Sequence, residues 1–271
     1  MILQFTNNSN NYLSFLSPQV AYLCNMENKL SYKLDIPCYM FDNRSLLRAA
    51  AFMDIAQELA VQGSFQLGFA DRQLAPYNVV WVLARMHVKF NSLPPMYSSA
   101  TAETWSRGQI GLCHIRDYRL LAENGESLVD STSSWILMEK TKRTIVRPNS
   151  LGDAVDCAPQ NTAFAIEEPA ERILLPKDFP LEAVAEHRVI YSDLDCNGHT
   201  NNAKYTVWAM DCLPGDLVRN HDIKEITINF NHEAMFGETV TLYHALKDNA
   251  HIVEGRSGDT QIFISKLIFQ E

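Results

Sequence analysis

The feature of this sequence that most restricts its fold is an order of elements that occurs twice: a helix pattern, followed by a run of alternating strands. Residues 45–62 give an amphipathic helix pattern that ends at Gly63, and residues 203–213 give a second one that is apolar nearly all round. Segments such as Trp81–Phe90 follow, in which apolar and polar residues alternate as in antiparallel strands with one buried face. The order predicts an α+β protein with two similar units, each containing a helix followed by antiparallel strands.

The two halves are joined by a segment without any sustained period. Prolines, acids and small residues between Pro148 and Pro180 indicate a connector, in which we expect residues 165–172 to form a short surface helix. Strands are expected at 32–36, 81–90, 100–106, 112–121, 127–139 and 143–147, and then at 187–191, 223–230, 239–246, 251–255 and 260–269. The expected division is an N-terminal extension over 1–30, a first domain over 31–150, a linker over 151–182 and a second domain over 183–271.

Composition excludes several classes of protein. The 271 residues are 46% hydrophobic, enough for one large core or two smaller ones, and no apolar run is long enough to span a bilayer. A net charge of −9 without a basic, aromatic-rich patch argues against a nucleic-acid partner. The six cysteines show neither paired nor zinc-like spacing, so we expect reduced thiols in a cytoplasmic protein. The sequence shows no metal-site pattern and no phosphate-cradling glycine loop, so we expect no metal and no cofactor.

The first 26 residues differ from the rest because they carry no charged side chain and no organised period. A secretory signal would need a positive start and an organelle transit peptide would need arginine, so neither is supported. Met26 opens the first charged segment. The stretch before it is interpreted as a misassigned start or a loose extension outside the core.

The densest polar cluster in the chain lies directly before the second helix. Within the run Asp193–Tyr205, the side chains of Asp195, Asn197 and His199 alternate and can project to one side, and an asparagine after them can cap the helix. An aspartate can orient an imidazole, a histidine changes protonation near neutral pH, and an amide can donate to a developing oxyanion. The same residues would also suit a plain turn with His199 packed on the helix.

That run, D-L-D-x-N-x-H-x-N-N-x-K-Y, resembles the signature of the acyl-acyl carrier protein thioesterases, which release fatty acids from the carrier protein. Segments around Trp81, Trp105 and Trp135 also resemble the family, so the resemblance covers roughly residues 31–270. Family members consist of two hotdog domains, each a long helix wrapped by an antiparallel sheet, with the signature in the second. The resemblance implies two tandem hotdog domains and a hydrolase acting on fatty acyl-acyl carrier protein in fatty acid biosynthesis.

Carried over position by position, the resemblance implies a catalytic set of Asp195, Asn197, His199 and Glu233. Thioester hydrolysis needs an activated water and a stabilised oxyanion, and a desolvated carboxylate can serve as the base, so Glu233 is assigned that role. Asn197 would hold the thioester or the water, His199 would polarise the carbonyl or pass a proton to the thiolate, and Asp195 would orient its neighbours. Taken alone, Glu233 would also suit a solvated strand end.

One departure from the family bears on the reaction route. Plant members commonly carry Glu-Cys where this chain has Glu233-Ala234. Cys196 and Cys212 are interpreted as small loop or core residues, so direct attack by water is expected in place of a covalent cysteine route.

The resemblance also implies an apolar tunnel for the acyl chain, largely in the first domain. The expected lining residues are Phe52, Met53, Trp81, Met86 and Trp105, although each would also suit ordinary core. Acyl carrier proteins are acidic, as this chain is, so docking requires a local basic surface. The candidates are Lys140, Lys142, Arg143 and Arg147, although such a run is also typical of a solvated strand face.

Three alternatives stay open at this point. An acyl-CoA thioesterase, or a hydratase acting on unsaturated acyl chains, could use the same fold with Asp and His. A non-enzymatic acyl-binding protein would be expected to lack a catalytic residue, and none of the implied set is missing. Because two fused hotdog domains imitate the dimer of single-domain members, either a monomer or a homodimer is expected.

Overall fold

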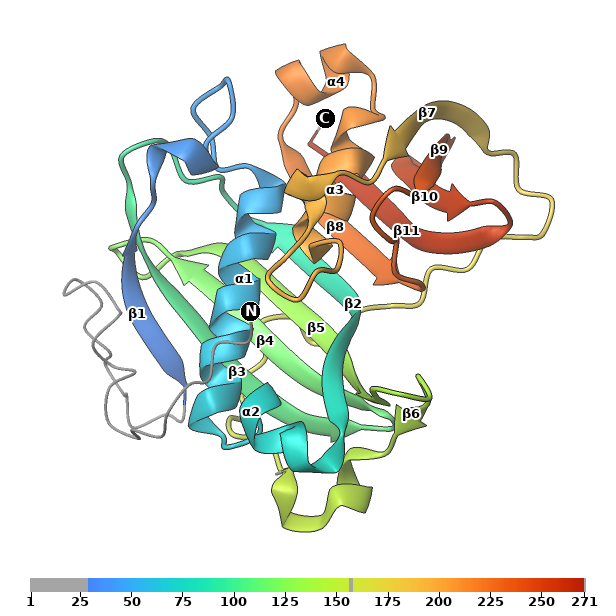
Figure 1. The fold of residues 1–271 in the computed structure, drawn as a ribbon. Helices are drawn as coiled ribbons and strands as arrows, with labels where there is room; N and C mark the ends of the chain where they lie inside the picture. Colours follow the sequence, from blue (N-terminus) through green and yellow to red (C-terminus); the bar gives the residue numbers. More distant parts are fainter. Residues whose placement is uncertain (1–28, 156–157, 271) are drawn as a thin grey trace.

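The computed structural model describes residues 29–155 and 158–270, and its strands form one eleven-stranded antiparallel sheet with few helices (Figure 1). The strands are β1 (Leu30–Asp35), β2 (Val79–Phe90), β3 (Ser99–Ile110), β4 (Cys113–Leu121), β5 (Ser127–Glu139), β6 (Ile145–Val146), β7 (Glu182–Arg188), β8 (Ile223–Phe230), β9 (Thr239–Lys247), β10 (Ala250–Ser257) and β11 (Thr260–Phe269). The α-helices are α1 (Ala49–Gln66), α2 (Asp71–Leu74), α3 (Asn202–Asp211) and α4 (Gly215–Asn220). The expected α+β class is confirmed.

The strand order divides the sheet into two halves with the same topology. The order is β1-β3-β4-β5-β2 in the first half and β8-β11-β10-β9-β7 in the second, with β6 paired to β5. From its outer edge inward, the second half has the order β7-β9-β10-β11-β8. Each of these strands corresponds in sequence order to the strand at the same place in the first half. The halves meet where β2 and β8 pair antiparallel, from Arg85 opposite Asn229 to Lys89 opposite Glu225. This is the arrangement of two helix-on-sheet units related by a pseudo-twofold axis.

The long helix α1 covers one face of the first half (Figure 1). Its buried residues are Ala49, Ala50, Ala51, Phe52, Met53, Ile55, Ala56, Leu59, Ala60 and Gly63. The helix was expected to end at Gly63, which was wrong: Gly63 lies inside it, and the helix continues to Gln66. A Cβ at Gly63 would lie 2.3 Å from Arg116 Nη1, so the glycine is there because the helix packs closely on a buried arginine of the sheet.

The alternation of residues 81–90 predicts that Val82 and Ala84 share a buried face of β2 with Met86, Val88 and Phe90, and this is only partly correct. Met86, Val88 and Phe90 are buried in the core, as the alternation predicts. The register shifts at Ala84, so that Leu83 faces Trp135 and is buried with the core residues. A bulge of this kind adds one residue to a strand and reverses the alternation before it.

The connector between the halves lies extended against the sheet, and the short helix expected at 165–172 is absent there. Trp105 Nε1 donates to the Ala163 carbonyl at 2.8 Å, and the buried Asp117 accepts from the Ala165 N–H at 2.8 Å. Arg107 also donates to the Ile166 carbonyl. Side chains of the sheet thus satisfy backbone groups that a helix would satisfy internally.

The N-terminal residues, the strand expected at 187–191 and the lengths of the helices can each be compared with the sequence-based expectation. Residues 1–28 of the expected extension, and the candidate start at Met26, lie outside the described residues, whereas Leu30 begins β1 and is buried. The strand expected at 187–191 ends at Arg188 and is followed by a short 3-10 turn over Tyr191–Asp193. In the part of the chain that the structure describes, no helix is both long and apolar enough to cross a membrane.

Candidate active site

The predicted polar run forms a tight loop before α3 that is organised by its own aspartate. Asp195 Oδ1 accepts from the backbone N–H groups of Asn197 at 2.8 Å and His199 at 3.1 Å. The Asp195 N–H donates to the His199 carbonyl at 2.7 Å. Gly198 has φ of 80°, a conformation that glycine adopts without strain. The Asp195 carboxylate therefore shapes the loop that carries the other residues.

The loop passes directly into α3. Asn201 Oδ1 accepts from the Ala203 N–H at 2.8 Å, so the expected helix cap is confirmed and Asn201 provides it. Asn197 and Cys196 are exposed on the loop. Within the described residues, no hydrogen bond of the Asn197 side chain is found, which leaves its amide available to a ligand.

The segment after β8 turns toward this loop and is attached by one hydrogen bond to the loop and by another to α3. Thr200 Oγ1 donates to the Ala234 carbonyl at 2.6 Å, and the Ala234 N–H donates to the Tyr205 hydroxyl at 3.1 Å. Ala234 is fully buried, so a small side chain fits at this position. As a result, Glu233 Oε1 lies 3.2 Å from His199 Nδ1. Two residues that the sequence predicted to act together are therefore in contact.

A basic residue from the first half of the chain reaches the same carboxylate. Arg143, in the turn between β5 and β6, donates from Nη2 to Glu233 Oε2 at 3.1 Å. The Glu233 side chain is 19% exposed, whereas those of His199 and Arg143 are 49% and 57% exposed. The two oxygens of a partly enclosed carboxylate are thus divided between an imidazole and a guanidinium at the surface.

The contact of Arg143 with Glu233 was missed by sequence reasoning, which assigned Arg143 to carrier-protein docking. Ninety positions separate the two residues, and the pairing of β2 with β8 is what brings the two halves of the chain together. The other basic candidates are exposed at or beside the same turn; they are Lys140, Lys142 and Arg147. The basic run therefore lies at the edge of the Glu233 site.

Glu233 and Arg143 open onto a shallow depression in the surface. Its lining consists of Arg143, His232, Glu233, Met235, Glu238, Ser257, Thr260 and Ile262. Met235 in this lining and the next residue, Phe236, are half or more exposed. A thioester presented from the surface could approach Glu233 through this depression.

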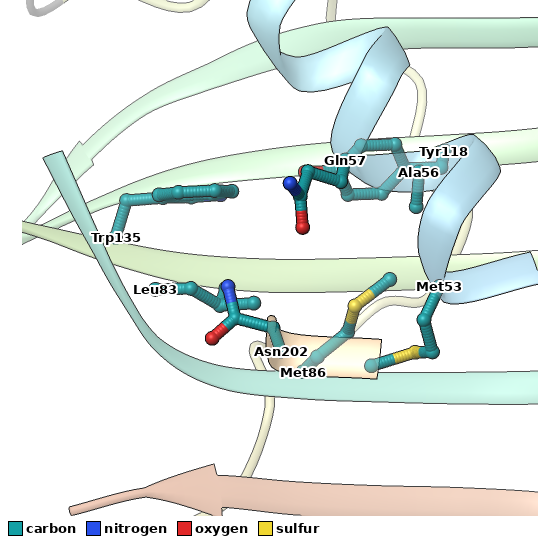
Figure 2. A pocket seen from close by; sticks show the side chains of 8 residues that line it. All are labelled: Met53, Ala56, Gln57, Leu83, Met86, Tyr118, Trp135 and Asn202. Atoms are coloured by element: carbon teal, nitrogen blue, oxygen red, sulfur yellow. The ribbon is translucent and has the colours of Figure 1, made fainter. Parts of the chain in front are cut away.

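A second, enclosed cavity of about 10 Å³ lies between α1, the first half of the sheet and the start of α3 (Figure 2). It is lined by Met53, Ala56, Gln57, Leu83, Met86, Tyr118, Trp135 and Asn202. Its volume corresponds to roughly one water molecule. The methionines from α1 and β2 narrow it, and such flexible side chains can move to admit an acyl chain.

Only part of the expected tunnel lining surrounds this cavity. Met53 and Met86 line it, and Phe52 lies in the core with its ring against Phe90. Trp81 lies elsewhere, with its ring against Phe69. Trp105 lies on the opposite face of the sheet, beneath the connector. The alternation of β3 could have shown that Trp105 faces away from α1, but residue type alone could not.

Neither cysteine near the site has the features of a nucleophile. Cys196 is exposed on the loop, and among the described residues no imidazole or other base contacts its thiol, whereas Cys212 is partly buried after α3. Burial raises the pKa of Cys212 to about 11, so its sulfur is protonated at neutral pH. The site thus offers a carboxylate and an imidazole in contact, with an exposed amide on the same loop.

Comparisons with known proteins agree with this architecture. The sequence model of the acyl-ACP thioesterase N-terminal domain matches residues 27–150, and that of the C-terminal domain matches residues 180–264. Oleoyl-acyl carrier protein thioesterases 1 and 2, chloroplastic, of Arabidopsis thaliana are 27% and 28% identical over 84% and 79% of this chain. The matches cover 67% and 63% of those relatives, so this chain spans about two thirds of their length.

Solved structures show the same fold. An acyl-ACP thioesterase from Bacteroides thetaiotaomicron superposes with a TM-score of 0.79 at 21% identity, covering 90% of this chain and 98% of that one. The 12:0-ACP thioesterase from Umbellularia californica gives 0.78 at 19% identity, covering 89% and 97%. The expected hotdog fold is confirmed. With both halves matched in order by the two domain models, the chain belongs to the acyl-ACP thioesterase family.

Proposed function

We propose that this protein hydrolyses the thioester of fatty acyl chains attached to acyl carrier protein and releases free fatty acid. The observation that carries the proposal is the 3.2 Å contact between Glu233 Oε1 and His199 Nδ1. The exposed amide of Asn197 lies on the same loop as the imidazole. Family membership supplies the reaction class, and this contact supplies the groups that can perform it.

The proposed reaction uses water as the nucleophile. Glu233 takes a proton from a water molecule, whose oxygen attacks the thioester carbonyl carbon. The carbonyl oxygen becomes negative, and the Asn197 amide donates to it. The carbon–sulfur bond then breaks, and His199 passes the proton received from Glu233 to the leaving thiolate. No covalent bond to the protein forms.

Two further residues would position this machinery without touching the substrate. Asp195 uses its carboxylate for the loop amides, so its proposed role is to hold Asn197 and His199 in place. Arg143 fixes the second oxygen of Glu233 and so directs the first oxygen toward His199. Glu233, the proposed base, is then held by Arg143 from the first half of the chain and by His199 from the second.

Acyl carrier protein is the proposed partner, and the process is proposed to be fatty acid biosynthesis. The exposed basic residues Lys140, Lys142 and Arg147 lie at or beside the turn that carries Arg143. They would provide local attraction for an acidic partner although the whole chain has a net charge of −9. We also propose the domain division 31–150 and 183–271, with the linker between, while a cytoplasmic location and the choice between monomer and homodimer stay predictions.

A side-by-side assay tests the proposed activity. The full chain is incubated with acyl chains of matched length carried by acyl carrier protein and by CoA, and free acid and free thiol are measured. We expect kcat/KM to be higher for the carrier-protein substrates by about tenfold or more, equivalent to ~1.4 kcal/mol. A strong preference for CoA would replace the proposal with an acyl-CoA thioesterase.

A further inference from the structure

A buried basic cluster that the proposed mechanism does not use lies beneath α1 in the first half of the sheet. It consists of Arg116 and His114 on β4, with Thr104 and Ser106 on β3. All are at most 3% exposed. Strand register places both β4 residues on the same face as Tyr118, which lines the enclosed cavity.

The Arg116 guanidinium is only partly satisfied by hydrogen bonds. Nη1 donates to Thr104 Oγ1 at 3.2 Å and packs against Gly63 of α1. Nη2 is buried without a hydrogen-bond partner. Burial lowers the pKa of Arg116, but an arginine side chain stays charged in proteins. A charged donor is therefore available inside the first half.

His114 supplies a second unpartnered nitrogen on the same face. Its Nε2 lies 2.8 Å from Ser106 Oγ, and that oxygen already accepts from the Gly108 N–H at 3.0 Å. The Ser106 hydroxyl can therefore donate to Nε2, which leaves the hydrogen on Nδ1, and Nδ1 is buried without a partner. Burial and the Arg116 charge lower the pKa of His114 to about 3, so the ring is neutral at physiological pH.

Among the described residues, no carboxylate balances the Arg116 charge. Asp117, the next residue, points to the opposite face, where it lies 3.6 Å from Arg107. Glu103 lies on that face too, 3.7 Å from Lys29. The cluster packs against a glycine of α1 and hydroxyl side chains of β3 and β5, and the rings of Phe69 and Trp81 pack on His114 at centroid distances of 5.2 and 5.4 Å. A buried, unpaired charge is costly, and a bound anion would remove that cost.

Wall residues connect the cavity that the acyl chain would enter to the cluster, whose own residues do not line the cavity. The Tyr118 hydroxyl and Trp135 Nε1 both contact Ser133 Oγ, at 2.9 and 2.7 Å. Ser133 is also the β5 residue directly opposite Arg116. Figure 2 shows Tyr118 and Trp135 on the wall of the cavity on either side of Gln57, with Asn202 from the start of α3 near Leu83 and Met86. Arg116 lies two residues from Tyr118 on the same face of β4, so an acyl chain that extended beyond Tyr118 along this strand would reach it.

We propose that the first half of this protein binds acyl chains whose distal end carries a carboxylate, with Arg116 as its ion-pair partner and His114 as a second donor. The inference rests on the proposed function and narrows its substrate to ω-carboxyacyl thioesters. A carboxylate accepts well from a guanidinium and would satisfy Arg116 Nη2. The methylene part of the chain lies between Met53 and Met86.

Binding measurements test the inference without requiring catalysis. Calorimetry compares α,ω-dicarboxylic acids with monocarboxylic acids of equal length on the full wild-type chain. We expect the dicarboxylic acid to bind about tenfold more tightly or better, which is ~1.4 kcal/mol. An equal or weaker affinity would overturn the inference and assign the unpartnered nitrogens to buried water.

A pair of variants on one strand locates the effect. Arg116→Met is expected to abolish the preference for the dicarboxylic acid. Arg119→Met is the matched control, because Arg119 lies on the opposite face of β4 and pairs with Asp130 at 2.7 Å, so the preference should persist. Persistence of the preference in Arg116→Met would refute the assignment. His114→Gln provides a second variant if Arg116→Met does not fold, and it is expected to weaken the preference.

Hydrolysis assays separate this inference from the proposed function. The wild type is expected to hydrolyse ω-carboxyacyl-acyl carrier protein faster than the unsubstituted chain of equal length, with the order reversed in Arg116→Met. If no acyl-acyl carrier protein is hydrolysed but the dicarboxylic acid still binds preferentially, the function fails and the binding site stands. If only unsubstituted chains are hydrolysed and no diacid preference exists, the function stands and the binding site fails.

Discussion

The turns before α1 and α3 have the same backbone and different side chains. Asp42 Oδ1 accepts from the N–H groups of Arg44 at 2.8 Å and Leu46 at 3.0 Å. Asp195 Oδ1 accepts from the corresponding two amides, at 2.8 and 3.1 Å. In each turn the fourth residue has a positive φ. The aspartate therefore belongs to the shared scaffold, because the turn before α1 has it as well.

The segments after β2 and β8 correspond in the same way. In the first half, the N–H groups of residues 91 and 92 both donate to the Leu128 carbonyl, and in the second those of residues 231 and 232 donate to the Ile262 carbonyl. In this correspondence Leu93 stands at the place of Glu233, and Leu46 stands at the place of His199. An apolar pair in one half thus occupies the positions of the acid–imidazole pair in the other. The comparison teaches that the scaffold is common and that the reacting groups are particular to the second half.

The largest effect should come from removing the carboxylate that distinguishes the second half. Glu233→Gln is expected to lower kcat by about 10²- to 10⁴-fold, since an amide cannot take a proton from water. His199→Gln should also lower kcat, whereas His232→Gln, in the same depression, serves as the control and should leave kcat within a few-fold. Single-turnover rates and thermal unfolding check these expectations. Near wild-type activity in Glu233→Gln would place the chemistry elsewhere.

Replacing the scaffold aspartate in each half separates stability from activity. Asp195→Ala and Asp42→Ala each remove an acceptor of two backbone N–H groups, and each should cost about 1–3 kcal/mol of the free energy of unfolding. Only the Asp195 change should lower kcat strongly, because only that turn carries His199. Urea denaturation and kcat measure the two effects. An equal fall of kcat in Asp42→Ala would contradict the division of roles.

The buried histidine of the first half should make that half sensitive to acid. His114 has a folded pKa of about 3 against an ordinary value of 6.5, so its contribution to stability is complete above pH 6.5. As the pH falls toward 3, only the unfolded chain gains this proton, and stability declines by ~1.4 kcal/mol per pH unit. His114→Gln should remove that part of the slope in denaturation series from pH 7 to pH 5. If the free energy of unfolding of His114→Gln fell with pH as steeply as that of the wild type, the assignment to His114 would be wrong.

A smaller effect is expected from the residue that links the two halves. Arg143→Met should lower kcat by about two- to fivefold, because an exposed ion pair contributes at most ~1 kcal/mol. The lower kcat of Arg143→Met should also be seen with a small acyl thioester that lacks the carrier protein. Lys142→Met, in the same turn, should raise KM for the carrier-protein substrate and leave the small substrate unaffected. If Arg143→Met and Lys142→Met both change kcat or KM only for the carrier-protein substrate, then Arg143 is a docking residue.

The smallest effect should come from the cysteine of the loop. Cys196 occupies the place that Asn43 has in the turn before α1, so it is part of the shared scaffold. Cys196→Ala is expected to retain most of the activity. The raised pKa of Cys212 should make that thiol slower than Cys196 to react with an alkylating reagent at neutral pH. A loss of activity as large as that of Glu233→Gln would restore a covalent route.

Local patterns in the sequence were sufficient for most of the fold. The strands expected at 127–139, 223–230 and 260–269 have the observed bounds. The middle of each strand is buried on both faces, so a run of strand-forming residues between turns located them. The contact of His199 with Glu233 was anticipated through the family resemblance and not through spacing. Periodicity thus located the elements, and the resemblance located the site.

The errors occur where a residue's environment comes from a distant segment. Gly63 looked like a helix end because its packing partner, Arg116, lies on a strand more than fifty residues away. The connector at 165–172 looked helical because its backbone partners belong to the sheet. Arg143 looked like a docking residue because nothing near it in sequence indicates Glu233. These features depend on tertiary contacts that a local pattern does not contain.

The most direct test of the account is a single turnover with acyl-acyl carrier protein in water enriched in oxygen-18. If Glu233 activates water, the released acid gains one labelled oxygen, the peptide containing Glu233 gains none, and intact-mass spectra show no acylated protein. Label in Glu233, or an acyl group on the protein during turnover, would show that a side chain attacks the thioester and would contradict the account.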